Sequence, residues 1–348
     1  MRAVTPSVLV SILNWNKPED TVRCVRALRS TLESSTVEVS LLLIDNGSRR
    51  ECVEALQVLE GLPNVRIHYE PENLGFAGGH NIAIRQAIAE GTDFIWLLNS
   101  DAEVGDDTLA RLVDAMADRP RCGALSPIIV AAHDAAAIDF CGAVHDWPRL
   151  RSLRTSSLEE SRRLQHEHPQ DMWVTGTAVL LRVEALRETG PLDARYFAYY
   201  EDDDIGARLS RAGWTSEVDF DTVIRHDCLD GLLRNRPAYY FYLMNRNHLM
   251  FWHAHTPAPH RRFLRARLLQ HALFEANKLR QDGLDAKSDA AMLGIYDFLR
   301  GTHGAPKLDR KLPWTAAAAR ILSRVLHASA LSKRRKTLAA QAREAMSA

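Results

Sequence analysis

Residues 94–101, with the sequence FIWLLNSD, join a continuous apolar run to a polar end. An apolar run of this kind is typical of a strand that is buried on both faces of a parallel sheet. Open parallel sheets bind ligands at the carboxyl ends of their strands. The stretch therefore predicts a buried strand that delivers Asp101 to a ligand-binding crevice.

Similar apolar runs alternate with helical patterns on both sides of this stretch. The helix after the first run begins near Pro18, and the acids in its first turn suit the helix dipole. Alternating strands and helices favour a mostly parallel sheet with helices on both faces. We predict a Rossmann-like α/β fold with further strands at residues 8–13, 41–44, 65–69 and 124–130.

Polar side chains follow four of the predicted strands at the point where each strand ends. Because the carboxyl ends of parallel strands meet at one edge of the sheet, we expect a single crevice to collect them. They are Asn14 and Asn16 after the first strand, Asp45 after the second, Asn73 after the third, and Asn99 and Asp101 after the fourth.

The second half of the chain has a different organisation. Residues 145–170 are polar and lack a clear period, which indicates a surface loop or a mobile flap over the site. A strand is expected at residues 172–181, and the pattern beyond Pro237 is helical to the end. We predict an α/β domain over residues 1–236 and a helical C-terminal region over residues 237–348.

Charge is balanced in total but not along the chain. The 348 residues carry 44 Lys and Arg against 44 Asp and Glu, so the total gives no indication of a nucleic-acid partner. Between Lys307 and Ala348, ten basic residues stand against two acids. The C-terminal end is therefore basic.

The cysteines and the hydropathy favour a reducing compartment. The chain has five widely spaced cysteines and no C-x-x-C pair, which argues against a disulfide framework or a zinc site and fits the cytoplasm. We see no signal peptide and no apolar run of about 18 residues, so we expect any membrane contact to be peripheral.

Two turn-like motifs are candidates for nucleotide binding. In residues 45–48, DNGS, Asp45 could accept hydrogen bonds from a base or a ribose, although these residue types also form plain Asx-type turns. Residues 73–81, NLGFAGGHN, could offer backbone N–H groups to negatively charged groups, or could form a tight turn capped by Asn or His. The second motif lacks both the Walker and the dinucleotide pattern.

Asp101 and His226 are candidates for a metal site. Mg²⁺ and Mn²⁺ typically take one or two protein carboxylates and complete their shell with phosphates and water. Asp101 could instead cap the helix that follows it. His226 closes another apolar strand and could bind a metal or a phosphate, although a lone histidine is more often structural.

The acidic run at residues 201–204, EDDD, precedes a predicted helix. Asp203 and Asp204 fit a plain helix start, because N-terminal acids suit the dipole and Asp204 lies four residues before Arg208. Asp202, crowded by like charges and partly desolvated, is expected to have a raised pKa. A raised pKa suits a general base that accepts a proton from a hydroxyl group.

Taken together and in order, these motifs resemble family-2 glycosyltransferases, and most of all their rhamnosyltransferase-like branch. The match runs from about Val8 to His226. The resemblance implies a GT-A fold and an inverting, metal-dependent sugar transfer from a nucleoside diphosphate donor. The matching segments are ILNWN (12–16), DNGS (45–48), NLGFAGG (73–79), NSD (99–101), TGT (175–177) and YYED (199–202).

The resemblance also implies roles for individual residues. Asp202 would be the catalytic base, and Asp101 with His226 would bind Mg²⁺ or Mn²⁺. Asn99 stands where many relatives have Asp, which leaves one carboxylate fewer at the metal. The donor-binding residues would be Asn14, Asn16, Asp45, Asn73, Gly75, Gly79, Asn99 and Asp101, and the acceptor side would include Trp173, Gly176 and Glu201.

The implied reaction moves a sugar, with rhamnose the first choice, from a dTDP- or UDP-sugar to a glycan or lipid-linked glycan in cell-surface polysaccharide synthesis. Two alternatives remain open. One is a nucleotidyltransferase, although no Gly-rich loop bearing Arg or Lys follows the first strand. The other is a protein that binds a nucleotide-sugar or a glycan without transferring it.

The C-terminal region carries a membrane hypothesis. Four arginines between Arg261 and Arg267 interleave with apolar residues, and residues 333–336 read KRRK. This pattern is expected for a helix on an anionic membrane surface at the cytoplasmic face. A solvated helix that packs one face on the protein would show a similar pattern.

Overall fold

The computed structural model describes residues 5–33, 36–226, 235–256 and 261–323. Internal contacts divide the chain into two compact units, residues 1–231 and 232–348. The predicted boundary was residue 236, and the observed one falls in a stretch outside the described residues. Each unit is considered by itself below.

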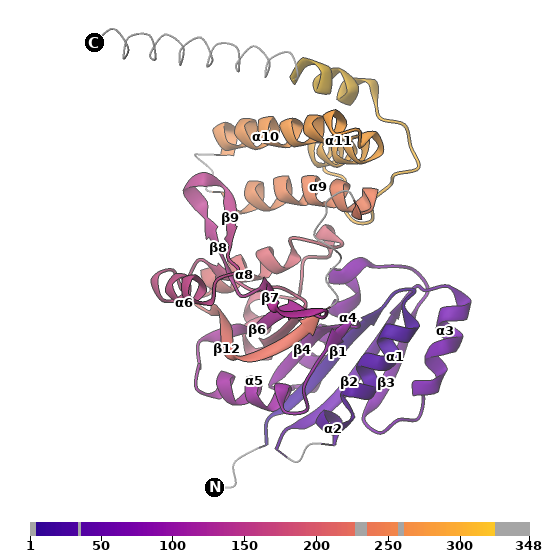
Figure 1. Cartoon of the computed structure of the whole chain (residues 1–348), viewed down its shortest axis with the longest axis vertical. Coiled ribbons are helices and arrows are strands. Elements are labelled where there is room, and N and C mark those ends of the chain that lie inside the picture. The colour runs from indigo at the N-terminus through magenta and orange to yellow at the C-terminus, as the bar shows by residue number, and fades with distance from the viewer. Residues whose placement is uncertain (1–4, 34–35, 227–234, 257–260, 324–348) are drawn as a thin grey trace. The chain divides into compact units, whose positions relative to one another are not determined.

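The first unit is built on a nine-stranded sheet with the order β3-β2-β1-β4-β11-β6-β12-β5, in which β7 pairs with β6 (Figure 1). The strands are β1 (Ser7–Asn14), β2 (Glu38–Asn46), β3 (Val65–Glu70), β4 (Phe94–Asn99), β5 (Ala102–Glu103), β6 (Cys122–Ala131), β7 (Asp134–Phe140), β11 (Ala178–Arg182) and β12 (Thr215–His226).

Most long pairings in this sheet are parallel, as predicted. β1 pairs in parallel with β2 and β4, β2 with β3, and β6 with β12. β11 is the exception, because it lies antiparallel between β4 and β6. Its first residue, Ala178, pairs with Leu98 near the end of β4, so the residues that precede β11 reach the carboxyl edge of the sheet.

Helices cover both faces of the sheet, which confirms the prediction (Figure 1). The strand order reverses direction between β1 and β4, and right-handed crossovers then place α1 and α3 on one face and α4 on the other. The helices are α1 (Pro18–Ala27), α2 (Arg29–Leu32), α3 (Arg50–Leu56), α4 (Gly75–Glu90), α5 (Thr108–Ala117), α6 (Leu158–Glu167), α7 (Val183–Thr189) and α8 (Glu201–Arg211).

The central strands form the core because they are apolar on both faces. Every residue of β6 is buried, and Trp96 of β4 has no exposed surface. The indole Nε1 of Trp96 donates to the carbonyl of Ala178 at 3.3 Å, so this buried donor is satisfied. The sheet therefore offers a rigid platform for the side chains at its carboxyl edge.

Residues 145–170 are not the irregular loop that the sequence suggested. They contain most of the β8–β9 hairpin and then α6. Strands β8 (Ala143–Asp146) and β9 (Arg151–Arg154) form a three-stranded sheet with β10 (Met172–Trp173), which follows α6. Ser157 caps α6 by accepting a hydrogen bond from the backbone N–H of Glu160 at 3.3 Å. The expected strand at 172–181 is also divided, since β10 and β11 are separate.

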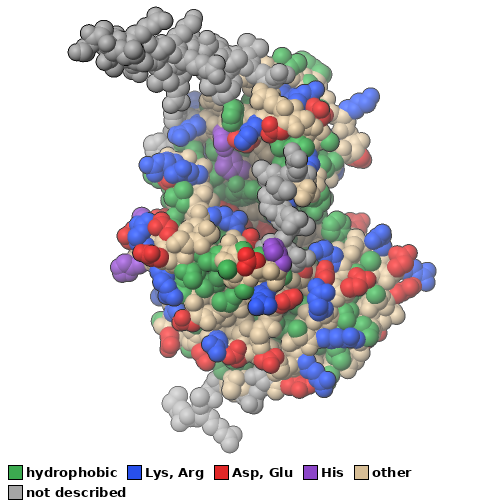
Figure 2. Space-filling view, in the orientation of Figure 1, with side chains coloured by type: hydrophobic (Ala, Val, Ile, Leu, Met, Phe, Trp, Pro, Cys, Tyr) green, Lys and Arg blue, Asp and Glu red, His purple; other side chains and the backbone are tan. Residues whose placement is uncertain are grey.

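Both signs of charge are mixed on the surface of the first unit. Figure 2 shows basic and acidic side chains interspersed over the face in view. Several of them form pairs within one helix, such as Arg50 with Glu54 at 2.8 Å. Exposed helix pairs of this kind stabilise by roughly 0.3–0.5 kcal/mol, and the mixture leaves no large field of one sign on this face.

The second unit is helical in its described part, as predicted. Its elements are α9 (Ala238–His255), α10 (Arg261–Gln281), α11 (Asp285–Arg300) and a helical stretch at residues 314–323. A Cβ on Gly294 of α11 would lie 2.3 Å from the carbonyl oxygen of Tyr242, so glycine permits α9 and α11 to pack closely. Across the described ranges, no helix has the length and apolar character needed to cross a membrane.

Candidate active site

The ends of β1 and β2 carry an interlocked set of polar side chains. Asn14 and Asp45 are direct partners in the parallel register, and Asn14 Nδ2 donates to Asp45 Oδ1 at 2.7 Å. The backbone N–H of Ser48 donates to Asp45 Oδ2 at 3.1 Å. We call Asn14, Asn16, Asp45, Asn46, Ser48 and Asn73 the amide cluster.

Asp45 is only 1% exposed, and both of its carboxylate oxygens already accept hydrogen bonds within the protein. These bonds are those of an Asx-type turn, one of the two alternatives that the sequence left open. Contact between Asp45 and a nucleotide therefore stays a prediction.

Asn16 extends the amide cluster toward the next turn. Its backbone has a positive φ of 57°, a conformation that Asn tolerates better than most residues. Its N–H donates to Ser48 Oγ at 2.9 Å, and its Oδ1 accepts from the N–H of Arg49 at 2.8 Å. The turns after β1 and β2 are thus held together by side chains.

The glycine-rich turn before α4 is fixed by two asparagines. The backbone N–H of Leu74 donates to Asn46 Oδ1 at 3.0 Å, and that of Gly75 donates to Asn73 Oδ1 at 2.7 Å. These N–H groups are therefore engaged within the protein. The observed bonds are those of a tight turn capped by Asn, and anion binding by this turn remains a prediction.

Close packing surrounds two of the glycines in this segment and requires Gly75. A Cβ on Gly79 would lie 2.4 Å from a methyl carbon at the flexible end of the Leu13 side chain, whereas one on Gly75 would lie 2.3 Å from the backbone carbonyl oxygen of Phe197. The same carbonyl accepts a hydrogen bond from the N–H of Ala77 at 3.1 Å. The donor-binding roles expected for Gly75 and Gly79 are untested, but their packing roles are visible.

The segment that leads into α8 is strained. Phe197, Tyr199 and Tyr200 have positive φ values of 68°, 68° and 75°. For bulky side chains such values cost on the order of 1–3 kcal/mol each, and they cluster at functional sites. The sequence analysis singled out residues 199–202 but missed the left-handed backbone of this segment, because nothing in its composition marks one.

A second polar group lies where β4 and β12 end. Asp101 Oδ1 lies 3.1 Å from His226 Nε2, and Asp101 Oδ2 lies 3.2 Å from Lys17 Nζ. His226 Nε2 also lies 3.1 Å from the amide nitrogen of Asn99. The structure thus brings together Asn99, Asp101 and His226, and it adds Lys17, which the sequence analysis did not single out.

Asp101 is ionised despite its environment. Burial raises the pKa of its carboxyl group, but the hydrogen bond and charge of His226 and the charge of Lys17 outweigh burial and hold the pKa at about 2. The side chain contacts these two residues, which does not support the alternative that Asp101 caps α5.

Asp101 and His226 are residue types that could hold Mg²⁺ or Mn²⁺. Asp101 Oδ1 and His226 Nε2 lie 3.1 Å apart, which is the distance of a direct ion pair between them. In the described ranges no group of three or more His, Cys, Asp or Glu residues forms a complete cage. An ion held by two residues would take its other ligands from phosphates and water.

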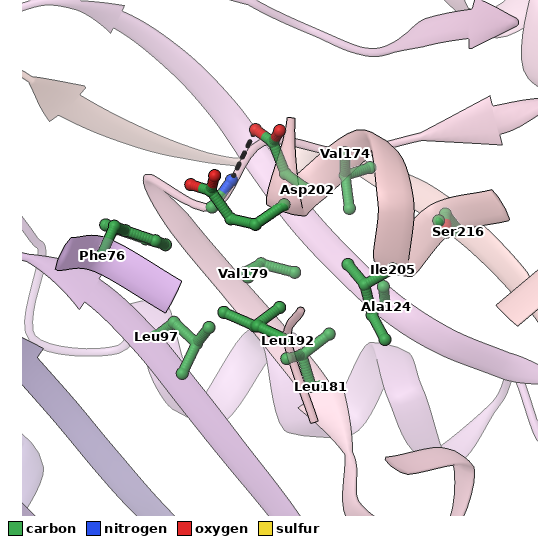
Figure 3. A pocket seen from close by; sticks show the side chains of 13 residues that line it. Phe76, Leu97, Ala124, Val174, Val179, Leu181, Leu192, Asp202, Ile205 and Ser216 are labelled. Carbon is green, nitrogen blue, oxygen red and sulfur yellow. Dashed lines mark hydrogen bonds between the residues drawn. The ribbon is translucent and has the colours of Figure 1, made fainter. Parts of the chain in front are cut away.

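Asp202 lies at the start of α8, next to the loop that precedes β11. The backbone N–H of Gly176 donates to Asp202 Oδ2 at 3.4 Å (Figure 3), and that of Asp203 donates to Oδ1 at 3.0 Å. Burial, followed by the charge of Asp203, raises the pKa of Asp202 to about 7. The same loop reaches β4, because Asn99 N–H donates to the carbonyl of Thr177 at 2.9 Å.

An apolar cavity lies next to the side chain of Asp202. Figure 3 shows Phe76, Leu97, Val179 and Leu192 around it, with the Asp202 carboxylate at its edge. The cavity holds about 10 Å³, enough for at most one water molecule. It is therefore too small for a sugar, and its effect is to keep water away from the neighbouring carboxyl groups.

Glu201 lines the same cavity and is 6% exposed. Its Oε2 atom has no hydrogen-bond partner among the described residues. Burial, followed by the charge of Asp202, raises the pKa of Glu201 well above its ordinary value. Burial therefore favours the neutral form of Glu201, and it does not favour the direct acceptor contact that the resemblance implied.

Asp203 and Asp204 hold α8 in place. Asp204 pairs with Arg208 at 2.7 Å, the helix pair that its spacing predicted. Asp203 has a further role that the sequence did not reveal, because its Oδ1 accepts from Ser152 Oγ at 2.9 Å and lies 3.1 Å from His145 Nε2. The β8–β9 hairpin therefore fixes the residue next to Asp202.

Trp173 does not occupy the position expected of an acceptor contact. Its side chain is 4% exposed, and a Cβ on Gly206 of α8 would lie 2.7 Å from the Cβ of Trp173. Its ring packs against Phe140 with centroids 5.6 Å apart. The expected acceptor role is corrected to a packing role under α8, because a buried ring offers no surface to a substrate.

Solved structures with the same fold are glycosyltransferases. Staphylococcus aureus TarS residues 1–349 in complex with UDP-GlcNAc has a TM-score of 0.56 at 13% identity, over 92% of this chain and 87% of that one. The mannosyltransferase PcManGT from Pyrobaculum calidifontis, in complex with GDP-Man and Mn²⁺, has a TM-score of 0.51 at 16% identity, over 93% and 81%. The fold is GT-A, as the resemblance implied.

The sequence comparisons define the family. The model of glycosyl transferase family 2 matches residues 7–190, and the chain belongs to this family. The N-acetylglucosaminyl-diphospho-decaprenol L-rhamnosyltransferase of Mycobacterium tuberculosis is 31% identical over 258 residues, 66% of this chain and 82% of the relative. The galactofuranosyltransferase GlfT1 of that organism is 23% identical over 235 residues, 65% and 71%. The chain is thus a glycosyltransferase similar to rhamnosyltransferases.

Proposed function

We propose that this glycosyltransferase is inverting and metal-dependent and that Asp202 is its catalytic base. The observation that carries the proposal is the position of Asp202 beside the Gly176 loop, with a pKa of about 7. A base with a pKa near the working pH is substantially ionised and can still accept a proton effectively. Asp203 and Asp204 are engaged with neighbouring side chains, and Glu201 is buried.

In the proposed reaction, the acceptor hydroxyl oxygen attacks the anomeric carbon from the face opposite the leaving diphosphate. Asp202 takes the hydroxyl proton while the bond from the anomeric carbon to the diphosphate oxygen breaks. The transition state resembles an oxocarbenium ion, and the configuration at the anomeric carbon inverts. The nucleoside diphosphate carries away the bonding electron pair.

Asp101 and His226 would hold the Mg²⁺ or Mn²⁺ ion. A bound ion of this kind neutralises the charge that develops on a leaving diphosphate. Lys17, whose Nζ lies 3.2 Å from Asp101 Oδ2, places a further positive charge at the same point. Asn14, Asn16, Asp45, Asn73 and Asn99 would shape the donor side of the crevice.

We further propose a dTDP- or UDP-sugar donor, with L-rhamnose as the first candidate, and a glycan or lipid-linked glycan acceptor at the cytoplasmic face of a membrane. The support is the similarity to the decaprenol-linked rhamnosyltransferase over 82% of that relative. A nucleotidyltransferase or a non-catalytic binding protein would not use a base such as Asp202 in this way.

The proposal is tested by incubating the full chain with dTDP-L-rhamnose or UDP-sugars, Mn²⁺ and a short-chain diphospholipid acceptor. We expect nucleoside diphosphate release and a product whose anomeric configuration, read by NMR, is opposite to that of the donor. Retained configuration would remove the inverting mechanism. Pyrophosphate exchange without transfer would favour a nucleotidyltransferase, and donor binding without release under all conditions would favour a binding protein.

The metal is tested separately by calorimetric titration of the nucleoside diphosphate with and without Mn²⁺. We expect tighter binding with Mn²⁺, and we expect Asp101→Ala to abolish the difference. Asp221→Ala removes an exposed carboxylate elsewhere in the first unit and should keep the difference. Equal affinity with and without Mn²⁺ in the unaltered chain would exclude a metal role for Asp101.

A further inference from the structure

The helical stretch at residues 314–323 is held against the rest of the second unit by one side only. Ala316 is 6% exposed. Asn277 of α10 donates to Ser323 Oγ at 2.7 Å, and the Arg320 guanidinium forms an ion pair with Asp289 of α11. Ala316, Arg320 and Ser323 follow the i, i+4, i+7 spacing of one helix face, so this face is fixed to α10 and α11.

The opposite side of the same helix is apolar and exposed. Trp314 is 80% exposed, Ile321 62% and Leu322 59%, and these are the most exposed large apolar side chains of the described residues. At about 100° per residue, Trp314 and Ile321 lie about 20° apart around the helix axis, and both point away from Ala316. Exposed Ala318 lies between them along the helix. Grouped apolar exposure of this kind marks an interaction surface.

The sequence around this face is mainly basic. Residues 310–343 contain nine Lys and Arg and no Asp or Glu, and Asp309 and Glu344 flank this run. In its described part, Arg310 pairs with Asp297 and Arg320 with Asp289. Residues 324–348 lie outside the described part of the structure. A partner for this face must therefore combine an apolar interior with a negatively charged surface, which is the combination that anionic lipids present.

We propose that the face formed by Trp314, Ala318, Ile321 and Leu322, which we call the Trp314 face, docks on the surface of an anionic lipid bilayer. The helix would lie in the plane of the interface, with its apolar side chains at the boundary of headgroups and acyl chains. Tryptophan is enriched at this depth because its ring is apolar and its N–H is polar. Basic residues nearby would face the lipid phosphates.

This proposal moves the membrane contact away from the segment that the sequence indicated. Leu268, Ala272 and Ala276 of α10 are between 0% and 4% exposed, while Phe274 is 38% exposed. One face of α10 is thus packed within the protein, which favours the alternative left open above. The cluster at residues 333–336 lies outside the described residues.

The test is sedimentation of the full chain with vesicles of phosphatidylcholine mixed with phosphatidylglycerol, and with phosphatidylcholine alone. We expect binding to the mixed vesicles at low salt and much weaker binding to the neutral ones. The double variant Trp314→Ser with Ile321→Ser should lower the partition coefficient at least about tenfold. Trp314→Phe should retain most of the binding.

The matched control is Leu299→Ser on α11, which removes a large apolar side chain that is 46% exposed in the same unit. This variant should bind as the unaltered chain does. Thermal melting of each variant checks folding, and Leu322→Gln provides a second variant if the double variant melts early.

Three results would overturn the proposal. The unaltered chain could fail to sediment with anionic vesicles, or the double variant could sediment equally well. Light scattering could also show a dimer without lipid that the double variant dissociates, which would assign the face to a second copy of the chain. The assay contains no sugar donor, so its outcome is independent of the proposed transfer reaction, which is measured with a short acceptor in detergent.

Discussion

The amide cluster and the start of α8 both place buried polar groups at the carboxyl edge of the sheet, but they differ in how well those groups are bonded. In the amide cluster, both oxygens of Asp45 accept short hydrogen bonds and Asn14 is bonded at both ends of its amide. At the start of α8, one oxygen of Glu201 has no partner among the described residues, whereas Asp202 accepts bonds of 3.0 Å from the N–H of Asp203 and 3.4 Å from that of Gly176.

This difference suggests different roles for the two regions: the amide cluster maintains the structure, and the start of α8 carries the reactive group. A buried polar group with a full set of hydrogen bonds contributes to stability and resists change. A carboxyl group that is crowded and poorly bonded has a displaced pKa, and displaced pKa values concentrate where protons move. We therefore expect changes in the amide cluster to act on folding and changes at the start of α8 to act on turnover.

The largest effect is expected for Asp202→Asn. The amide cannot accept the hydroxyl proton, so turnover should fall by about 10²- to 10⁴-fold while donor affinity is retained. Steady-state kinetics and donor titration measure the two quantities. Near-normal turnover in this variant would end the assignment of Asp202 as the base.

The control for this change is Asp204→Asn in the same helix. Asp204 is paired with Arg208 at 2.7 Å, and its loss should lower the melting temperature more than the turnover of the folded protein. Equal losses of turnover in the two variants would indicate that any change in α8 disrupts the site.

The next largest effect is expected for Asn14→Ala, and here on stability. Asn14 is fully buried, and its amide donates to the Asp45 carboxylate. Losing this bond and leaving Asp45 less well solvated should lower the free energy of unfolding by about 2–4 kcal/mol. Urea unfolding measures the change, and Gln57→Ala, which deletes an exposed amide, should change it by less than about 0.5 kcal/mol. A loss of turnover with unchanged stability would contradict the expectation that changes in the amide cluster act on folding.

A smaller effect is expected for Asp203→Asn, and it concerns pH. Burial and the charge of Asp203 raise the pKa of Asp202 to about 7, so kcat/KM should rise with pH through neutrality as the base ionises. Removing the Asp203 charge favours the Asp202 anion, and the acid limb should move to lower pH. Ser152→Ala, which keeps the charge of Asp203, should leave the limb near its original pH. A limb that stays in place in Asp203→Asn would contradict the electrostatic role of Asp203.

The smallest effect on turnover is expected for Glu201→Gln. Because burial favours the neutral form of Glu201, the amide is a close substitute, and turnover should change by less than about threefold. Stability should respond to pH with a definite sign. The native chain binds protons on Glu201 and Asp202 that the unfolded chain releases above about pH 4, so unfolding free energy should fall as pH rises from there to neutrality and beyond. Glu201→Gln should reduce that fall, and an unchanged pH dependence would show that Glu201 is ionised in the folded state.

The sequence predicted the parts of the fold that depend on local pattern. The apolar runs that became β1, β2, β4 and β6 were found because strands buried on both faces leave a continuous signal. β3 was found as well, although none of its residues is buried. The β8–β9 hairpin and α6 were missed, since α6 buries only Ser161 and Leu164 and has little apolar periodicity. The hairpin owes its place to partners far along the chain, such as Asp203.

The same distinction applies to the candidate site. Residue type and position at the end of a strand selected Asp101 and His226 as candidates, whereas Asp202 was selected from the acidic run before a predicted helix and from the resemblance. Other features of the site depend on long-range contacts, which no local pattern encodes. They are the hydrogen bonds that engage both oxygens of Asp45, the burial of Trp173 and the positive φ values before α8. Asn46 and Ser48 could have been singled out, because they lie within the turn motif beside Asp45.

One peptide group joins the two regions compared above. The carbonyl of Phe197 accepts the N–H of Ala77 and occupies the space that a Cβ on Gly75 would need. A side chain larger than hydrogen at position 75 would push on the chain that leads to Asp202, so an inherited change in this turn would be transmitted to the base. The turn at Gly75 and the start of α8 are therefore mechanically coupled, and we expect them to evolve as one unit.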